Sequence, residues 1–282
     1  MFRLENAKKQ YGDFALDITM EVRPGFVTGV IGKNGAGKTT AFKAGLGLIR
    51  MDGGEAFVFG KPVSELDEKD REMLGVVLSD SGFSGYLSIK DFLPVLSNLY
   101  SCFDRNYFLE KCGSFHLPLG KPIRQFSTGM KRKLQVIAAV SHDARLLILD
   151  EPTVGLDVVA RDEILGILRE YMETEGRAIL ISSHISGDLE GLCDDIYMID
   201  NGKILFHEET DALIDGYGLL KMTKEQYGRV EEKYLMSVRE EEYGYSALTN
   251  RKAFYMENYP DIVIEKGSID DVIMMMIRGE RV

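Results

Sequence analysis

Hydrophobic and polar residues alternate along the first 23 positions of the chain, where Leu16, Ile18, Met20 and Val22 lie in step. This period of two predicts antiparallel strands with one buried face. Residues 26–31 then form a short apolar run that contains β-branched side chains and no charge. Such a run is typical of a strand that is buried on both faces.

Similar apolar runs alternate with segments of helical spacing over the next 150 residues or so. We expect strands at residues 56–59, 76–78, 146–149 and 178–181, and helices at residues 38–49 and between the last two strands. Strands that alternate with helices predict a mostly parallel sheet covered on both sides. The helical spacing over residues 88–140 predicts an inserted α-helical subdomain, which we assign to about residues 80–142.

The last third of the chain has a different pattern of apolar and charged residues from the part before it. Two short strands at residues 196–199 and 203–206 are joined by Asn201-Gly202, which predicts a hairpin. Beyond residue 210 we expect a charged helix over residues 224–242, strands near Tyr245 and Ile262, and a final helix capped by Ser268 and Asp271. These patterns predict a main domain over residues 1–212 and a small C-terminal α+β extension over residues 213–282.

A glycine-rich segment follows the first buried strand and precedes a predicted helix. Residues 32–39 read Gly-Lys-Asn-Gly-Ala-Gly-Lys-Thr, which satisfies the P-loop pattern of nucleotide-binding proteins. Its backbone N–H groups and the positive end of the following helix favour a phosphate group at one point. We expect Lys38 to reach the β- and γ-phosphates and Thr39 to be a ligand of Mg²⁺. The predicted nucleotide-binding residues here are Asn34, Gly35, Ala36, Gly37, Lys38, Thr39 and Thr40.

Two adjacent carboxylates end the strand at residues 146–149. In parallel sheets of this kind the ligand lies at the carboxyl ends of the strands, where Asp150 and Glu151 are predicted to lie. We expect Asp150 to hold Mg²⁺ and Glu151 to orient the water that attacks the γ-phosphate. The sequence contains no Asn-Lys-x-Asp segment, the guanine-reading element expected of a GTPase.

Charge and cysteine content narrow the class of protein further. The net charge is -11, which disfavours attraction to phosphate-rich partners, so we expect no nucleic acid partner. The three cysteines have no metal-binding spacing, and no secretory leader opens the chain, so we expect a cytoplasmic protein. The longest apolar runs are far shorter than the roughly 18 residues of a membrane span.

A third segment indicates a particular family. Residues 126–130, Phe-Ser-Thr-Gly-Met, lie shortly before the two carboxylates and resemble the signature of ABC (ATP-binding cassette) ATPases, usually written Leu-Ser-Gly-Gly-Gln. Ser127 and Gly129 match that pattern, and the other three residues depart from it. The resemblance implies that Ser127 and Gly129 contact the ATP held by the opposite subunit of a dimer.

Other segments fit the same family in the same order, over about residues 1–210. Asp157 resembles the aspartate of the D-loop, and His184 resembles the switch histidine that contacts the γ-phosphate. Tyr11 resembles the aromatic residue that stacks on adenine. The resemblance therefore implies a P-loop NTPase (RecA-like) core with an antiparallel β subdomain, ATP and Mg²⁺ as cofactors, and Glu151, His184 and Lys38 as the catalytic residues.

The chain departs from this family where relatives carry the glutamine of the Q-loop. Ser79 and Asp80 stand there, and we expect Asp80 to substitute as a Mg²⁺ ligand. In the family this region also receives a short helix of a membrane-spanning subunit. Apolar residues follow it at Phe83, Tyr86, Leu87, Ile89 and Phe92, and they suit either such contacts or packing within the helical subdomain.

The function implied by the resemblance is an ATP-binding and ATP-hydrolysing subunit of an ABC transporter. It is expected to drive transport, with export favoured, through a separate integral-membrane permease, as a homodimer or as a heterodimer with a second ABC ATPase. Its expected place is the inner face of the cell membrane, held there by the permease. Two alternatives remain at this point: a soluble ABC-type ATPase not coupled to transport, and a regulatory ATP-binding module with little hydrolysis.

Overall fold

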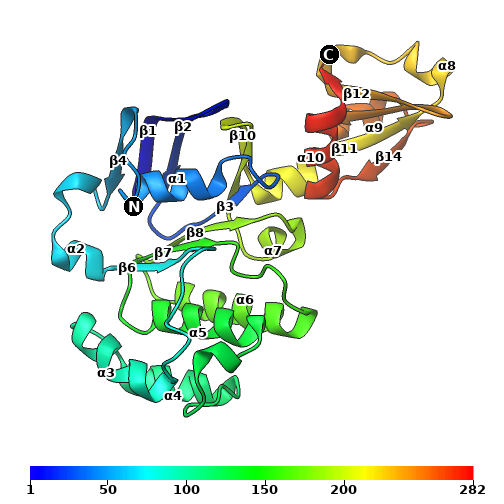
Figure 1. Ribbon diagram of the computed structural model, residues 1–282. Helices are drawn as coiled ribbons and strands as arrows, with labels where there is room; N and C mark the ends of the chain where they lie inside the picture. Colours follow the sequence, from blue (N-terminus) through cyan, green and yellow to red (C-terminus); the bar gives the residue numbers. More distant parts are fainter. Residues whose placement is uncertain (282) are drawn as a thin grey trace.

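A six-stranded sheet forms the centre of the computed structural model, which describes residues 1–281 (Figure 1). Five parallel strands lie side by side in it, and one antiparallel strand is added at the edge. The strand order is β10 (Lys203–Glu209), β9 (Asp195–Asp200), β3 (Val27–Ile31), β8 (Ala178–Ser183), β7 (Leu146–Asp150) and β6 (Leu74–Val77). Every residue of β3, β7 and β8 is buried, which confirms the expectation drawn from their apolar runs.

A second, antiparallel sheet packs above the first. It consists of β2 (Phe14–Val22), β1 (Phe2–Tyr11), β4 (Gly53–Val58) and β5 (Lys61–Pro62), in that order. The alternation in β2 buries every second residue, as the sequence predicted. Helix α1 (Lys38–Gly45) shares one apolar cluster with both sheets (Figure 1). This helix is shorter than expected, because the chain turns at Gly47, whose φ is +67°.

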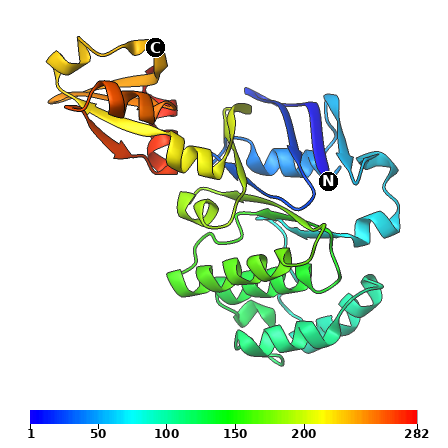
Figure 2. The same cartoon turned by 180° about the vertical axis from the view of Figure 1, so that it is seen from behind.

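Helices cover the other face of the six-stranded sheet. Most come from the predicted inserted segment: α3 (Ile89–Leu99), α4 (Arg105–Ser114), η2 (Ile123–Gln125) and α5 (Thr128–Val140). Helix α5 packs against β6 and against α6 (Val158–Met172), as Figure 2 shows from behind. Shorter elements are η1 (Val63–Glu65), α2 (Glu68–Glu72) and α7 (Ser186–Glu190). None of the described helices is long and apolar enough to cross a membrane.

The C-terminal region forms a separate five-stranded antiparallel sheet with its own helices (Figure 1). Its strand order is β14 (Val263–Lys266), β11 (Gly218–Met222), β13 (Gly244–Thr249), β12 (Leu235–Glu241) and β15 (Glu280–Arg281). The other elements are η3 (Ala212–Gly216), α8 (Lys224–Tyr227), η4 (Glu232–Tyr234), α9 (Lys252–Asn258) and α10 (Ile269–Arg278).

One sequence prediction in this region is wrong. The charged helix expected over residues 224–242 is only the four-residue α8, and the chain then pairs as strand β12 with β13. Pairing buries Leu235 and Val238 against the neighbouring strand, and this packing outweighs the helical preference of the charged residues. The final helix is confirmed, with the Ser268 and Asp271 capping box in place.

The C-terminal sheet is joined to the main body by α10. The amide of Ile269 donates to Glu190 Oε1 of α7 at 3.1 Å, and α10 packs on α7. Val272 and Met275 belong to the same apolar cluster as Leu189 of α7. Because this cluster also contains the interior of the main body, the division at residues 212 and 213 stays a prediction.

Candidate functional site

The P-loop lies between β3 and α1, as the sequence predicted, and glycine is needed at two of its positions. A Cβ on Gly32 would lie 2.2 Å from the carbonyl oxygen of Ile199. At Gly37, φ is +116°, and a Cβ would lie 3.0 Å from the ring of Phe14. Only a residue without a side chain tolerates both the backbone angle and the close contact. The glycines thus let the loop turn tightly where α1 begins.

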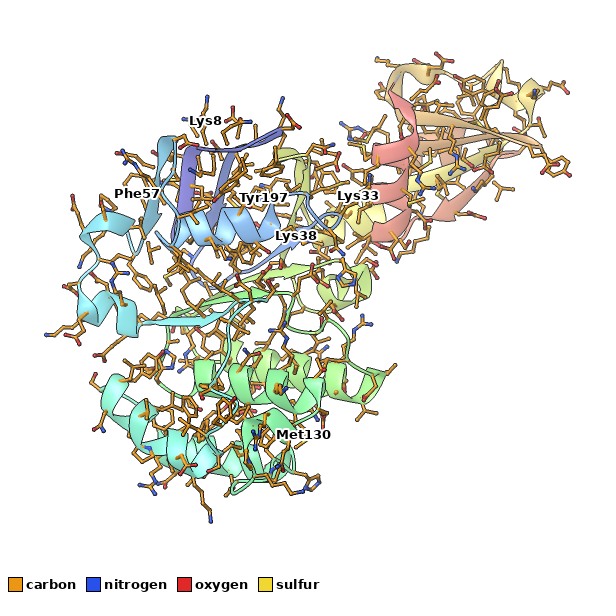
Figure 3. All side chains as sticks on the ribbon, viewed as in Figure 1. Lys8, Lys33, Lys38, Phe57, Met130 and Tyr197 are labelled. Atoms are coloured by element: carbon orange, nitrogen blue, oxygen red, sulfur yellow. The ribbon has the colours of Figure 1, made fainter. Side chains whose placement is uncertain are left out.

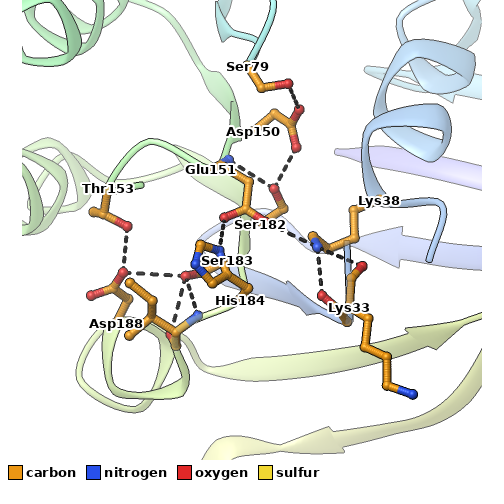
Figure 4. Close-up of polar contacts among 12 residues, drawn as sticks. Lys33, Lys38, Ser79, Asp150, Glu151, Thr153, Ser182, Ser183, His184 and Asp188 are labelled. Atoms are coloured by element: carbon orange, nitrogen blue, oxygen red, sulfur yellow. Dashed lines mark hydrogen bonds and ion pairs between the residues drawn. The ribbon is translucent and has the colours of Figure 1, made fainter. Parts of the chain in front are cut away.

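Lys38 is buried at the start of α1 and lies inside this loop (Figure 4). Its Nζ donates to the carbonyl oxygens of Gly32 at 2.6 Å and Lys33 at 3.2 Å. The same Nζ lies 3.1 Å from Glu151 Oε1. The carbonyl oxygens of the loop therefore hold the ammonium group in place. There it lies next to Glu151, the residue predicted as the catalytic carboxylate.

Three hydroxyl groups surround the fully buried carboxylate of Asp150. Thr39 and Ser79 each donate to Oδ2 at 2.7 Å, and Ser182 donates to Oδ1 at 2.7 Å. A carboxylate and hydroxyl oxygens are hard ligands of the kind that Mg²⁺ prefers. The residues at this point therefore fit a magnesium ion that arrives with a nucleotide, and the assignment of Thr39 and Asp150 as its ligands stays a prediction.

Glu151 stands at a strained point of the backbone, directly after β7. Its φ is +52°, which costs a non-glycine residue about 1–3 kcal/mol. Its amide donates to the carbonyl oxygen and the hydroxyl of Ser182, at 3.2 and 3.0 Å. These bonds hold the turn, so that the side chain reaches Lys38 on one side and His184 on the other. The Nδ1 of His184 lies 2.5 Å from Glu151 Oε2 (Figure 4).

A cavity of about 500 Å³ opens over this cluster. It brings Glu151 and His184 together with most of the predicted P-loop residues. The residues that line it are Phe14, Lys33, Asn34, Gly35, Gly37, Lys38, Thr39, Thr40, Ser79, Glu151, Val154 and His184. Ala36 is buried in the loop, where its carbonyl oxygen accepts from the amide of Gly202 at 2.8 Å.

The aromatic residue at this cavity is Phe14, which the sequence analysis did not select. Tyr11, which the family resemblance favoured, is half exposed and has Lys9 Nζ 5.2 Å from its ring centre. The two aromatic residues face each other across the turn between β1 and β2. The alternation along β2 could have predicted this position. It places Phe14 on the same face as Leu16, and both side chains lie against Gly37 of the P-loop. The role of Tyr11 stays a prediction.

The signature and D-loop residues lie at helix starts outside this cavity. Ser127 caps α5 and accepts from the amide of Met130 at 3.2 Å, and Gly129 lies in the first turn. Asp157 caps α6 and accepts from the amide of Ala160 at 2.8 Å. Figure 3 shows Met130 and Lys38 in different parts of the molecule. The structure thus does not bring the signature to the P-loop of the same chain.

Asp80 is not brought to the cluster around Asp150. Its carboxylate pairs with Lys43 Nζ at 2.6 Å, and its side chain is 62% exposed. The hydrogen bond from Lys43 lowers the pKa of Asp80. The oxygen that reaches Asp150 from this segment belongs to Ser79 instead. Asp80 as a metal ligand stays a prediction that its contacts do not support.

A buried aspartate that sequence reasoning missed ties the site to its surroundings. Asp188, in α7, has no exposed surface and accepts from the Thr153 hydroxyl at 2.5 Å. It also pairs with Arg161 of α6, and Ser183 Oγ lies 3.4 Å from it. Thr153 follows Glu151 by two residues, and Ser183 precedes His184. This carboxylate therefore fixes the segment after Glu151 and the segment before His184 relative to each other and to α6.

A buried lysine in a glycine-rich loop, a carboxylate with hydroxyls for a metal, and a Glu151–His184 pair define the nucleotide-hydrolysing P-loop class. Comparison with known proteins identifies the family within it. The family model described as ABC transporter matches residues 15–154. The chain is 33% identical over 216 residues to the lantibiotic transport ATP-binding protein SrtF of Streptococcus pyogenes, covering 75% of this chain and 92% of that one.

Two further likenesses agree. The Nod factor export ATP-binding protein I of Cupriavidus pinatubonensis is 32% identical, over 76% of this chain and 68% of its own length. A solved structure described as the ATP binding subunit of an ABC transporter has a TM-score of 0.67 and 25% identity, over 76% of this chain and 91% of that one. The chain belongs to the ABC transporter ATP-binding family, and it is an ATPase cassette with the P-loop NTPase fold.

Proposed function

We propose that ATP hydrolysis by this chain drives export through a separate integral-membrane permease. The observation that carries this proposal is the convergence of Lys38, Glu151 and His184 on one cavity beside the P-loop. The names of the relatives add the direction, because the Cupriavidus protein is named for export. The alternative of an ATPase unconnected to transport has no observation in its favour.

The roles in hydrolysis follow from the placement of each group. The P-loop amides and Lys38 bind the β- and γ-phosphates, and the ammonium stabilises the charge that develops there. Glu151 accepts a hydrogen bond from the attacking water, and His184 orients Glu151 and contacts the γ-phosphate. Mg²⁺, when bound by Thr39 and Asp150, supplies further positive charge to the phosphate oxygens.

A second cassette completes the site in this proposal. Ser127 and Gly129 lie at the start of α5, outside the cavity of their own chain, so they are free to meet a nucleotide on another chain. The exposed Val158 and Val159 follow Asp157 and supply apolar surface beside that contact. This arrangement supports a dimer of two cassettes, with either an identical chain or a second ABC ATPase.

A groove beside α5 suits the permease. This α5 groove has a volume of about 330 Å³ and is lined by Ser79, Ser81, Gly82, Phe83, Gly85, Ile123, Arg124, Thr128, Lys131, Arg132 and Gln135. Of the described residues that line it, three are cationic and none is a carboxylate. On a chain with a net charge of -11, this local positive charge favours an acidic segment of the partner. Docking there would hold the chain at the inner face of the membrane.

Two substitutions test the hydrolytic assignment. Glu151→Gln keeps the size of the side chain but removes the charge that polarises water, so ATP should bind normally and turnover should fall by about 100-fold or more. Lys38→Ala should instead lose nucleotide binding itself. Phosphate release and equilibrium ATP binding on the purified protein measure the two effects. Wild-type turnover in Glu151→Gln would remove Glu151 from the catalytic role.

A further inference from the structure

Asp188 is a buried charge whose contacts lie on the chain next to both Glu151 and His184 (Figure 4). Its Oδ2 accepts from the Thr153 hydroxyl at 2.5 Å and lies 3.4 Å from Ser183 Oγ, while Oδ1 pairs with Arg161. A buried ion pair is often no more stabilising than apolar residues of the same volume, so stability alone does not account for a carboxylate here. Its contacts indicate a role in the geometry of the site.

The Thr153 contact holds one end of the turn that begins at Glu151. The other end is held by the Glu151 amide, which donates to Ser182. Between them, the Val154 amide donates to the Glu151 carbonyl oxygen at 3.3 Å. Because φ of Glu151 is +52°, the turn is strained and keeps this shape only while its surroundings hold it. The bond from Thr153 to Asp188 therefore helps to set the direction in which the Glu151 side chain leaves the backbone.

The Ser183 contact holds the chain on either side of His184. Ser183 Oγ faces Asp188, accepts from the Ile185 amide at 3.0 Å and lies 3.2 Å from the Ile185 carbonyl oxygen. The His184 side chain is 40% exposed, so packing fixes it only in part. Its direction then depends on this backbone and on Glu151, whose Oε2 lies 2.5 Å from Nδ1. One carboxylate thus contacts both segments from which the Glu151–His184 pair projects.

Asp188 is itself held from two sides. Arg161 lies near the start of α6 and brings its guanidinium to Oδ1. Leu189, the next residue of α7, is fully buried and belongs to the same apolar cluster as Val272 of α10. A group can hold catalytic side chains in place only if its own position is fixed, and these contacts meet that condition.

We propose that Asp188 is a positioning residue for ATP hydrolysis, which acts through Thr153 and Ser183 on the relative placement of Glu151 and His184. The inference rests on the proposed function, because it takes Glu151 as the group that orients the attacking water and His184 as its partner. Asp188 does not line the nucleotide cavity, so its effect is indirect. Loss of its contacts should therefore lower turnover and leave ATP binding unchanged.

Variants of Thr153 test the shorter contact and keep the ion pair of Asp188. Thr153→Val replaces the hydroxyl by a methyl group at nearly the same volume, so kcat should fall about 10-fold while KM for ATP stays within about 2-fold. Thr153→Ser keeps the hydroxyl and should restore most of the turnover. The control is Thr210→Val, because Thr210 is as buried as Thr153 and its hydroxyl has no hydrogen-bond partner among residues 1–281. Turnover of this control should equal that of the wild type.

A double-mutant cycle shows whether Thr153 acts through Glu151. Once Glu151 has lost its charge, its exact placement matters little, so Thr153→Val should cost less than about 2-fold in the Glu151→Gln background. A contact that only stabilises the fold would cost the same factor in both backgrounds. Phosphate release by the full chain is measured well below the Tm of each variant, which circular dichroism gives.

The outcomes separate the inference from the proposed function. Equal kcat in Thr153→Val and wild type would overturn the inference. An equal loss in both backgrounds, or a fall as large in Thr210→Val, would overturn it as well. If the wild-type chain hydrolysed no ATP, or if Glu151→Gln kept the wild-type rate, the proposed function itself would fail, and neither result depends on any Thr153 variant.

Discussion

Removal of the Asp188 carboxylate should strongly destabilise the chain. Asp188→Ala deletes the acceptor of the Thr153 hydroxyl and leaves the Arg161 guanidinium without its partner. Breaking a buried ion pair by removing one member costs about 3–5 kcal/mol. For a chain of this size each kcal/mol lowers Tm by about 2–4 °C, so we expect a fall of about 6–20 °C.

Circular dichroism is the suitable assay, because the sequence contains no tryptophan for fluorescence. A second variant separates lost charge from lost packing: Asp188→Asn with Arg161→Met neutralises both members and keeps an acceptor for Thr153, so most of the stability should return. Asp162→Ala is the control on α6, the helix of Arg161, since the pair of Asp162 with Arg169 is exposed and should be worth less than about 1 kcal/mol. A cost below about 1 kcal/mol for Asp188→Ala would refute the reasoning.

Two further predictions concern the cavity and the response to acid. Phe14→Ala should weaken ATP binding by about 1–3 kcal/mol, the value of a base stacked on an aromatic ring, and Tyr11→Ala should weaken it less; titration with ATP decides between them. The hydrogen bond from Lys61 lowers the pKa of Asp70, so this contact stabilises the fold above the ordinary aspartate range and is lost as pH falls through the lowered pKa. Asp70→Asn should therefore be less stable than wild type at neutral pH and equal to it in acid, and a difference independent of pH would contradict this.

The central sheet and the position of the P-loop could be predicted because their signals are local. The run at residues 26–31 is apolar without interruption, and the P-loop follows it directly, so strand, loop and helix are fixed by neighbours in sequence. The carboxylates after residue 149 are placed by the same rule, since parallel strands bring their carboxyl ends to one edge. The capping box at Ser268 is equally local.

What could not be predicted depends on residues far apart in the chain. Residues 235–241 carry charges that suit a helix, and only pairing with β13 makes them a strand. The contact of Asp188 with Arg161 joins α7 to α6, and neither residue is unusual in its own segment. Which of Ser79 and Asp80 contacts Asp150 likewise depends on the directions of two adjacent side chains. A loop without periodicity does not reveal these directions.

The contact between Lys38 and Glu151 has a consequence for the site before a nucleotide binds. The ammonium group of Lys38 is the counter-ion of the Glu151 carboxylate, at 3.1 Å, in the place where the proposed function puts a phosphate group. An incoming triphosphate therefore competes with Glu151 for Lys38, and success in that competition frees the carboxylate to hold water. In the proposed function, binding of the substrate therefore releases Glu151 to act as the general base, and simple anions that mimic phosphate should break the same ion pair.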